Sequence, residues 1–236
     1  MASWALATHR KARPMSADVW DWSVAASITP VLLTATTQTV VVTGIAFIGA
    51  AALGLPIALA RRSHARAVRR PTAAIVEFIR STPLLIQIYT LYFLLPGVGL
   101  VLPALTSGLI ALSVHYATYV SETYRAALDS VPMGQREACA ALGLNPRQAM
   151  LTVVLPQAIV AAIPALGNHL IALFKETPLL SAIAIVELLQ TAKLIGAETF
   201  RYNEPITMVG VIFLGLSLLS AAMIRSLERR LSHWRS

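Results

Sequence analysis

Residues Glu137 to Pro156, with the sequence EACAALGLNPRQAMLTVVLP, form a polar, turn-bearing island between long apolar runs. The small residues after Glu137 predict a short helix. Gly143 tolerates the left-handed conformation that ends many helices, and Pro146 cannot continue one, so we expect that helix to stop there. A second helix is expected to start near Arg147 and to enter the next apolar run. Two short helices at an angle have the shape of a docking element rather than of a catalytic site.

The composition around this island is that of an integral membrane protein. The chain has 236 residues, of which 56% are hydrophobic and 13% charged, and its mean hydropathy is +0.68. These values exclude a soluble domain and leave room for roughly five or six membrane helices of about 20 residues each. The formal net charge of +8 would suggest nucleic acid in a soluble chain, but most basic residues lie beside the ends of apolar runs, where they set topology. We expect membrane lipid, and no nucleic acid, around this chain.

The sequence carries no pattern for a metal site or for ATP hydrolysis. Cys139 is the one cysteine, so neither an intrachain disulfide nor a thiolate metal site can form. The histidines are scattered without ligand spacing, and no glycine-rich loop followed by Lys occurs. We therefore expect no metal, no cofactor and no enzymatic activity in this chain, and any ATP would be bound by partner subunits.

The apolar runs predict an all-α fold with about five transmembrane helices. Pro30 is expected to divide the uncharged run 24–60, because one helix of that length, about 55 Å, would be nearly twice as long as the bilayer core is thick. The run Pro178–Ala192 is short and contains Glu187, so it predicts a re-entrant or interfacial helix, followed by an outer loop to Glu204. The predicted spans are 38–60, 71–95, 104–125, 157–174 and 205–224.

Five crossings place the arginines of 61–70 and 225–235, the polar island and the C-terminus on the cytoplasmic side, as the positive-inside rule requires. Six crossings, made by counting 178–192, would export the last arginine cluster. With five crossings the basic residues before Met15 lie on the outer side, which is an exception to this rule. The exception disappears if translation starts at Met15. We expect residues 1–18 to be an N-terminal extension without fixed structure, 19–231 to be one transmembrane domain and 232–236 to be a tail.

The polar island resembles the cytoplasmic coupling loop of permease subunits in binding-protein-dependent ATP-binding-cassette (ABC) importers. The shared order is Glu, Ala, a small residue, three residues, Gly, nine residues, an aliphatic residue, one residue, Leu and Pro. Cys139 stands where the family usually has Ala, and Val153 stands where Ile is commoner, but both keep the size and apolar character. An ordinary cytosolic turn between two spans is the alternative. The matching positions are Glu137, Ala138, Cys139, Gly143, Val153, Leu155 and Pro156.

This resemblance implies the fold of a type I ABC importer permease in the bacterial cytoplasmic membrane, with 126–156 as the coupling loop. It also implies the partners, which are two ATP-binding subunits, a second permease subunit that is homologous or identical, and an extracytoplasmic solute-binding protein. ATP-driven closure of the ATP-binding subunits would push Glu137–Gly143 as a lever and rock the spans between outward-open and inward-open states.

A six-residue pattern repeats at two membrane helices, as RSTPLL from Arg80 and as KETPLL from Lys175. In each copy the residue before Pro leaves helical geometry and the Pro lacks an N–H, so carbonyls are exposed where a solute could use them. The first copy also resembles the Arg-x-Thr-Pro segment of amino-acid-type importer permeases. Alternatively Arg80 pairs with Glu77, Lys175 reaches to the interface, and the repeat is chance. The residues expected to flank the solute path or its gate are Arg80, Thr82, Lys175, Glu176 and Thr177.

Nearly the whole chain resembles the histidine/glutamine-type branch of these permeases. Within it, VWDWSVAASITPVLLTA, HYATYVSETYR and GAETFRYNEPITMVG resemble permease subunits of ectoine/hydroxyectoine importers. This implies import of a small zwitterionic compatible solute, ectoine or hydroxyectoine, and a role in osmoprotection. The alternative is a polar amino acid such as histidine, glutamine or arginine. A more distant alternative is an ion-coupled secondary transporter that uses Glu122 or Glu187 as intramembrane acids.

Overall fold

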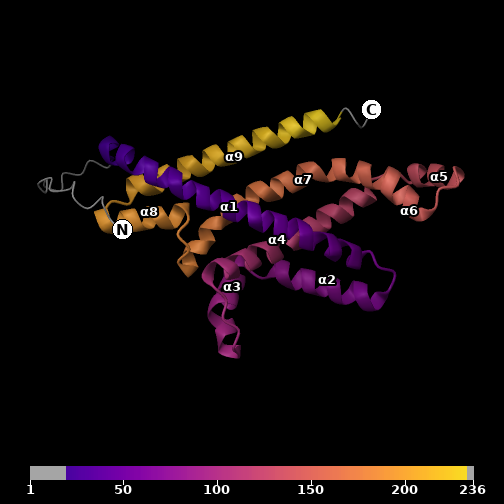
Figure 1. Ribbon diagram of the computed structural model, residues 1–236, viewed down its shortest axis with the longest axis horizontal. Coiled ribbons are helices and arrows are strands. Elements are labelled where there is room, and N and C mark those ends of the chain that lie inside the picture. The colour runs from indigo at the N-terminus through magenta and orange to yellow at the C-terminus, as the bar shows by residue number, and fades with distance from the viewer. Residues whose placement is uncertain (1–19, 233–236) are drawn as a thin grey trace, which may run out of the picture.

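The computed structural model describes residues 20–232, which are helical and contain no strand. The predicted extension 1–18, the alternative start at Met15 and residues 233–236 of the predicted tail lie outside this range. Long helices run along the molecule, and α5 and α6 lie together at one of its ends (Figure 1). The α-helices are α1 (Trp22–Arg61), α2 (Arg66–Ser81), α3 (Leu84–Tyr89), α4 (Ala104–Asp129), α5 (Met133–Ala141), α6 (Pro146–Ala149), α7 (Leu155–Glu176), α8 (Leu188–Thr199) and α9 (Asn203–Ser232). Short π-helical segments follow α3 (Thr90–Leu94) and α6 (Met150–Val154), and short 3₁₀ segments are Leu95–Val98 and Thr177–Ile183.

The predicted all-helical membrane fold is confirmed. In the described part of the chain, α1, the continuous helix Pro146–Ile183 and α9 are each long and apolar enough to cross a membrane, and the bent pair of α2 with Leu84–Val98 is a fourth candidate. The remaining predicted span corresponds to α4, which carries polar residues but lies against α1 and α7. Since these neighbours cover its polar side chains, α4 meets little lipid despite its composition.

The first span is not divided at Pro30. Helix α1 is 40 residues long and contains both Pro30 and Pro56. Pro30 is exposed near the start of this helix, and so is Ala26, whose carbonyl loses its partner because proline has no N–H. A carbonyl on the helix surface near the membrane edge can bind water, so the break predicted from Pro30 is not required.

The second predicted span, 71–95, is bent rather than straight. Helix α2 begins at Arg66 instead of Pro71, and the chain turns by 101° between Ser81 and Leu84. Thr82 has the extended angles φ −99° and ψ 130° that a following Pro83 favours. The apolar residues after the bend therefore leave the axis of α2, and α3 points away from the bundle (Figure 1).

The segment predicted as a short helix at 178–192 with an outer loop behind it is arranged differently. A 3₁₀ helix runs from Thr177 to Ile183, and α8 then occupies most of the predicted loop. Glu187 begins α8, because its carboxylate accepts hydrogen bonds from the N–H groups of Leu189 at 2.8 Å and Gln190 at 2.7 Å. This fully buried acid is thus a helix cap, a role that Asp, Asn, Ser and Thr fill more often than Glu.

Helices α1 and α4 form the centre of the bundle and pack closely through small residues. A Cβ on Gly54 would lie 2.8 Å from Val120 Cγ1, and one on Gly49 would lie 2.6 Å from Ser113 Oγ. Small residues let membrane helices approach each other in this way. The α1–α4 pair is therefore closely packed and supports the side chains at its two ends.

Candidate functional site

The polar island folds into two short helices joined by a tight turn, as the sequence predicts. Gly143 has a φ of 73° and directly follows the last turn of α5. The Leu144 N–H donates to the Cys139 carbonyl at 3.0 Å and the Gly143 N–H donates to the Ala140 carbonyl at 3.0 Å, which is the Schellman arrangement for ending a helix. On the other side of the turn, Asn145 caps α6 in a reciprocal pair of hydrogen bonds with Gln148.

Cys139 anchors this hairpin, while its outer surface is open. The side chain of Cys139 is only 3% exposed, whereas Leu142 is 79% exposed and Met133 is 70% exposed. Both apolar side chains are therefore open to contact with another protein. Among the residues of the predicted coupling signature, Leu155 and Val153 are half-buried, and the exposed ones are Glu137, Ala138, Gly143 and Pro156.

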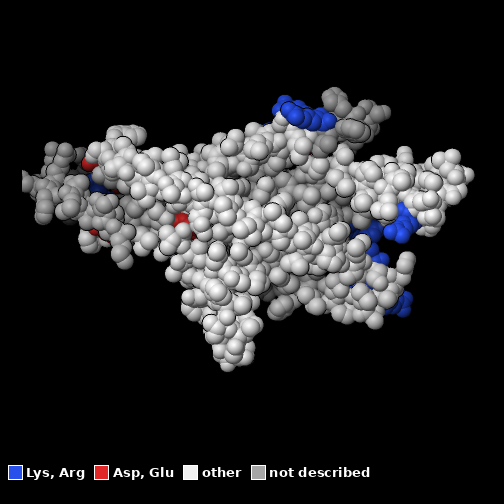
Figure 2. Space-filling view, in the orientation of Figure 1, with Lys and Arg blue, Asp and Glu red and all other residues white. Residues whose placement is uncertain are grey.

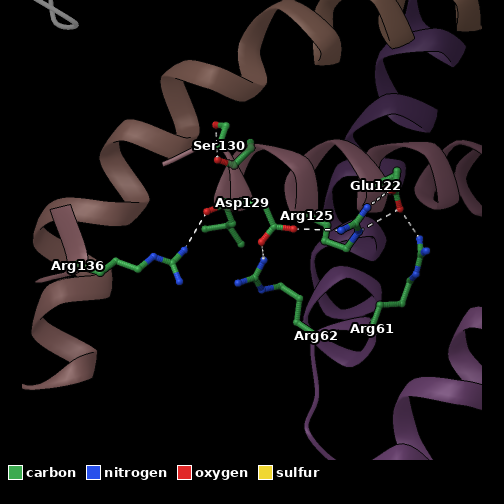
Figure 3. A network of polar contacts seen from close by, with 9 residues as sticks. Arg61, Arg62, Glu122, Arg125, Asp129, Ser130 and Arg136 are labelled. Carbon is green, nitrogen blue, oxygen red and sulfur yellow. Dashed lines mark hydrogen bonds and ion pairs between the residues drawn. The ribbon is translucent and has the colours of Figure 1, made fainter. Parts of the chain in front are cut away.

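The hairpin is joined to the end of α4 at its base. Arg136, on α5, donates from Nη2 to the Leu128 carbonyl at 3.0 Å, and Ser130 donates from its hydroxyl to the Ala127 carbonyl at 2.8 Å (Figure 3). These donors satisfy carbonyls that the end of a helix leaves without partners. Figure 2 shows that Lys and Arg side chains gather at this same end of the molecule, as the predicted clustering of the arginines requires.

The residues predicted for the solute path lie in two places, at the end of α2 and at the end of α7. The hydroxyl of Thr82 donates to the Phe78 carbonyl at 2.8 Å, and that of Thr177 donates to the Phe174 carbonyl at 2.7 Å, so both are bound to their own helices. Lys175 is exposed. Glu176 is half-buried beside the Tyr116 hydroxyl, and one of its carboxylate oxygens is buried without a hydrogen-bond partner.

Arg80 lies over an aromatic cluster that the sequence did not single out. Its guanidinium carbon is 4.8 Å from the ring centroid of Tyr119, within cation–π range. The Tyr119 ring in turn lies 5.3 Å from that of His115 and 6.1 Å from that of His169. Tyr119 and His115 share a face of α4 at i and i+4, a signal that the sequence contains, but His169 comes from α7 and has no local signal. Within residues 20–232 no ion pair joins Arg80 to Glu77.

The carbonyls at the α2–α3 bend are not free, in contrast to the prediction. Gln87 donates from Nε2 to the carbonyls of Ile79 at 2.8 Å and Thr82 at 3.0 Å. The same amide nitrogen lies 3.1 Å from His115 Nδ1. A solute at this bend would therefore meet the side chains around Arg80 rather than bare backbone. Nowhere in residues 20–232 do three His, Cys, Asp or Glu side chains lie close enough together to hold a metal ion.

Comparison with known proteins agrees with this architecture. Residues 50–233 match the family model of the binding-protein-dependent transport system inner membrane component. A probable amino-acid ABC transporter permease protein of Sinorhizobium fredii is 42% identical over 208 residues, which cover 88% of this chain and 90% of that protein. The L-cystine transport system permease protein of Bacillus subtilis is 36% identical over 215 residues, covering 89% and 92% of the two chains.

A solved structure is also similar. The crystal structure of an amino acid ABC transporter with histidines matches with a TM-score of 0.85 at 34% identity, covering 89% of this chain and 99% of that one. The resemblance carried by the polar island is thereby confirmed at the level of the family. The chain belongs to the inner membrane components of binding-protein-dependent transport systems.

Proposed function

We propose that this chain is the permease subunit of an ATP-driven importer for a polar amino acid. The observation that carries the proposal is the likeness, over 99% of the other chain, to an amino acid ABC transporter solved with histidines. Relatives described as permeases for amino acids and for L-cystine add support. They favour the amino-acid alternative over ectoine or hydroxyectoine, for which the resemblance of three sequence segments is the only argument.

In this proposal α5 and α6 dock on an ATP-binding subunit. The exposed Leu142 and Met133 supply apolar contact area, and the left-handed Gly143 fixes the angle between the two helices. The full complex contains two ATP-binding subunits, a second permease subunit that is identical or homologous, and an extracytoplasmic binding protein. The arginine-rich end that carries α5, α6 and the last turns of α9 faces the cytoplasm, so the C-terminus is cytoplasmic.

The solute passes the ends of α2 and α7. Arg80 offers a cation beside an aromatic surface for the carboxylate of the amino acid, and Glu176 has an unpaired carboxylate oxygen for its ammonium group. Charge-assisted hydrogen bonds of this kind are about twice as strong as neutral ones, and they suit a zwitterion. Lys175, Thr82 and Thr177 shape the path around these two groups.

Uptake by proteoliposomes tests the proposal. The permease is reconstituted with its ATP-binding subunits and binding protein, and uptake of labelled histidine, glutamine, arginine, cystine and ectoine is measured. We expect ATP-dependent uptake of an amino acid that persists when ion gradients are collapsed. Uptake of ectoine alone would contradict the proposal that the solute is an amino acid. Uptake that needs an ion gradient instead of ATP would contradict the proposal that the importer is driven by ATP.

Variants of the path are measured in the same vesicles. Arg80→Ala, Lys175→Ala and Glu176→Gln should each weaken uptake in fully assembled complexes, while Lys193→Ala, an exposed residue on α8, serves as the matched control. Wild-type rate and affinity in all three path variants would end the assignment of this route.

A further inference from the structure

Ion pairs join the ends of α1 and α4 beside the coupling helix α5 (Figure 3). Arg61, the last residue of α1, contacts Glu122 with its Nη1 2.6 Å from Oε2. Arg62, the C-cap residue of α1, contacts Asp129. Arg125 lies between the two acids, contacting Glu122 and placing its Nη1 3.0 Å from Asp129 Oδ2.

These contacts form one unit rather than separate pairs. Both acids are shared with Arg125, and they lie seven residues apart on α4, so both face the end of α1. The side chains are between 21% and 47% exposed. A single exposed ion pair contributes little, but several charges that share partners hold one another in place. These two contacts add to the close packing of α1 against α4 and hold the adjacent ends of the two helices together.

The unit is connected to α5 through the chain and through a hydrogen bond. Only residues 130–132 separate α4 from α5, and Val131 among them is buried in a cluster with Leu128 and Val154. Arg136 of α5 binds the Leu128 carbonyl at 3.0 Å, directly beside Asp129. A displacement of α5 would therefore reach α4 first at Leu128 and Asp129, and Asp129 contacts Arg62 at the end of α1.

We propose that Arg61, Arg62, Glu122, Arg125 and Asp129 form a charged clamp that passes the movement of α5 to α1. With the clamp closed, α1 and α4 move as one body when ATP drives α5. The five side chains are positioning residues: they touch neither solute nor nucleotide, and they act through the helices that they hold together. The inference rests on the proposed function, because it assumes that α5 receives movement from an ATP-binding subunit.

The test compares uptake with ATP hydrolysis in the reconstituted complex. The Arg62–Asp129 contact is removed from the α4 side by Asp129→Asn, which keeps the side-chain shape, from the α1 side by Arg62→Ala, and from both sides by the double variant. The measured quantity is the number of solute molecules imported per ATP hydrolysed. We expect each single variant to lower this ratio by at least about threefold while hydrolysis is retained. The double variant should lower the ratio no further than the single variant with the lower ratio does.

Two further variants separate transmission from simple folding. Arg62→Lys keeps the charge and should restore the ratio to within about twofold of wild type. Arg69→Ala removes an exposed arginine from α2 and should leave the ratio unchanged. Any of three results would overturn the clamp. These are a wild-type ratio in both single variants, additive losses of the ratio in the double variant, and a loss of uptake that is explained by reduced complex assembly while the ratio stays unchanged. Failure of the proposed function itself would look different, since the wild-type complex would then show no ATP-dependent uptake.

Discussion

Replacing Gly143 with Ala would isolate the effect of backbone strain at the turn between α5 and α6. Gly143 has a φ of 73°, and an added Cβ would meet nothing within 4 Å, so the substitution creates no clash. The remaining cost is that of a left-handed conformation for a residue with a Cβ, about 1–2 kcal/mol. If docking on the ATP-binding subunit requires this angle between the helices, the docking affinity should fall by about five- to thirtyfold.

The affinity is measured by titrating purified ATP-binding subunit onto the permease in nanodiscs. Gly134→Ala is the matched control, because Gly134 lies within α5 and also has open space around its Cβ position. Alanine there favours the helix, so docking should not weaken. Gly143→Asn should fall between wild type and Gly143→Ala, since Asn tolerates the left-handed conformation better than Ala does. An affinity for Gly143→Ala within about twofold of wild type would refute the dependence of docking on this turn.

Further substitutions test the packing of the bundle by the melting temperature of the purified protein. Gly54→Leu should lower it, because the new Cβ would lie 2.8 Å from a carbon atom of α4 and overpacking costs about 1–3 kcal/mol; Gly44→Leu, where nothing lies within 4 Å, is the control. Gln87→Ala should destabilise by about 1–3 kcal/mol, because the Thr82 carbonyl loses the Gln87 amide and the Ile79 carbonyl keeps only the Thr82 N–H. An unchanged melting temperature would mean that water replaces the amide. Glu187→Ala should cost about 0.5–2 kcal/mol through loss of the α8 cap, whereas Lys193→Ala should stay near wild type.

The membrane class and the hairpin of α5 and α6 could be predicted because their signals are local. Gly143 and Pro146 specify a left-handed helix end and a new helix start within a few residues, and the structure has both. The arginines beside the apolar runs predict which helix ends lie together, and they do gather at one end of the molecule (Figure 2). In each case a few neighbouring residues determine the outcome.

The aromatic cluster under Arg80 and the charged clamp could not be predicted in the same way. The ring of His169 lies 6.1 Å from that of Tyr119, yet the two residues are on α7 and α4. Glu122 could be paired with Arg125 from their spacing alone, and that pair exists. Its second partner, Arg61, is 61 residues away and is brought near only because α1 and α4 pack side by side. Contacts across helices depend on packing that a local pattern does not encode.

The repeated pattern shows why a proline alone does not determine a break. RSTPLL and KETPLL both place Thr-Pro at a membrane helix, but the chain bends by 101° only at the first. At the second, α7 passes into the 3₁₀ helix Thr177–Ile183, and the two remain part of one candidate span, 146–183. Seven residues after Arg80 stands Gln87, whose amide donates to the Ile79 and Thr82 carbonyls at the bend. Seven residues after Lys175 stands Ala182, whose side chain has no donor. A bend exposes carbonyls that are costly to leave unpaired in the membrane. The proline therefore permits the bend, and the amide of Gln87, held beside His115 on α4, stabilises it.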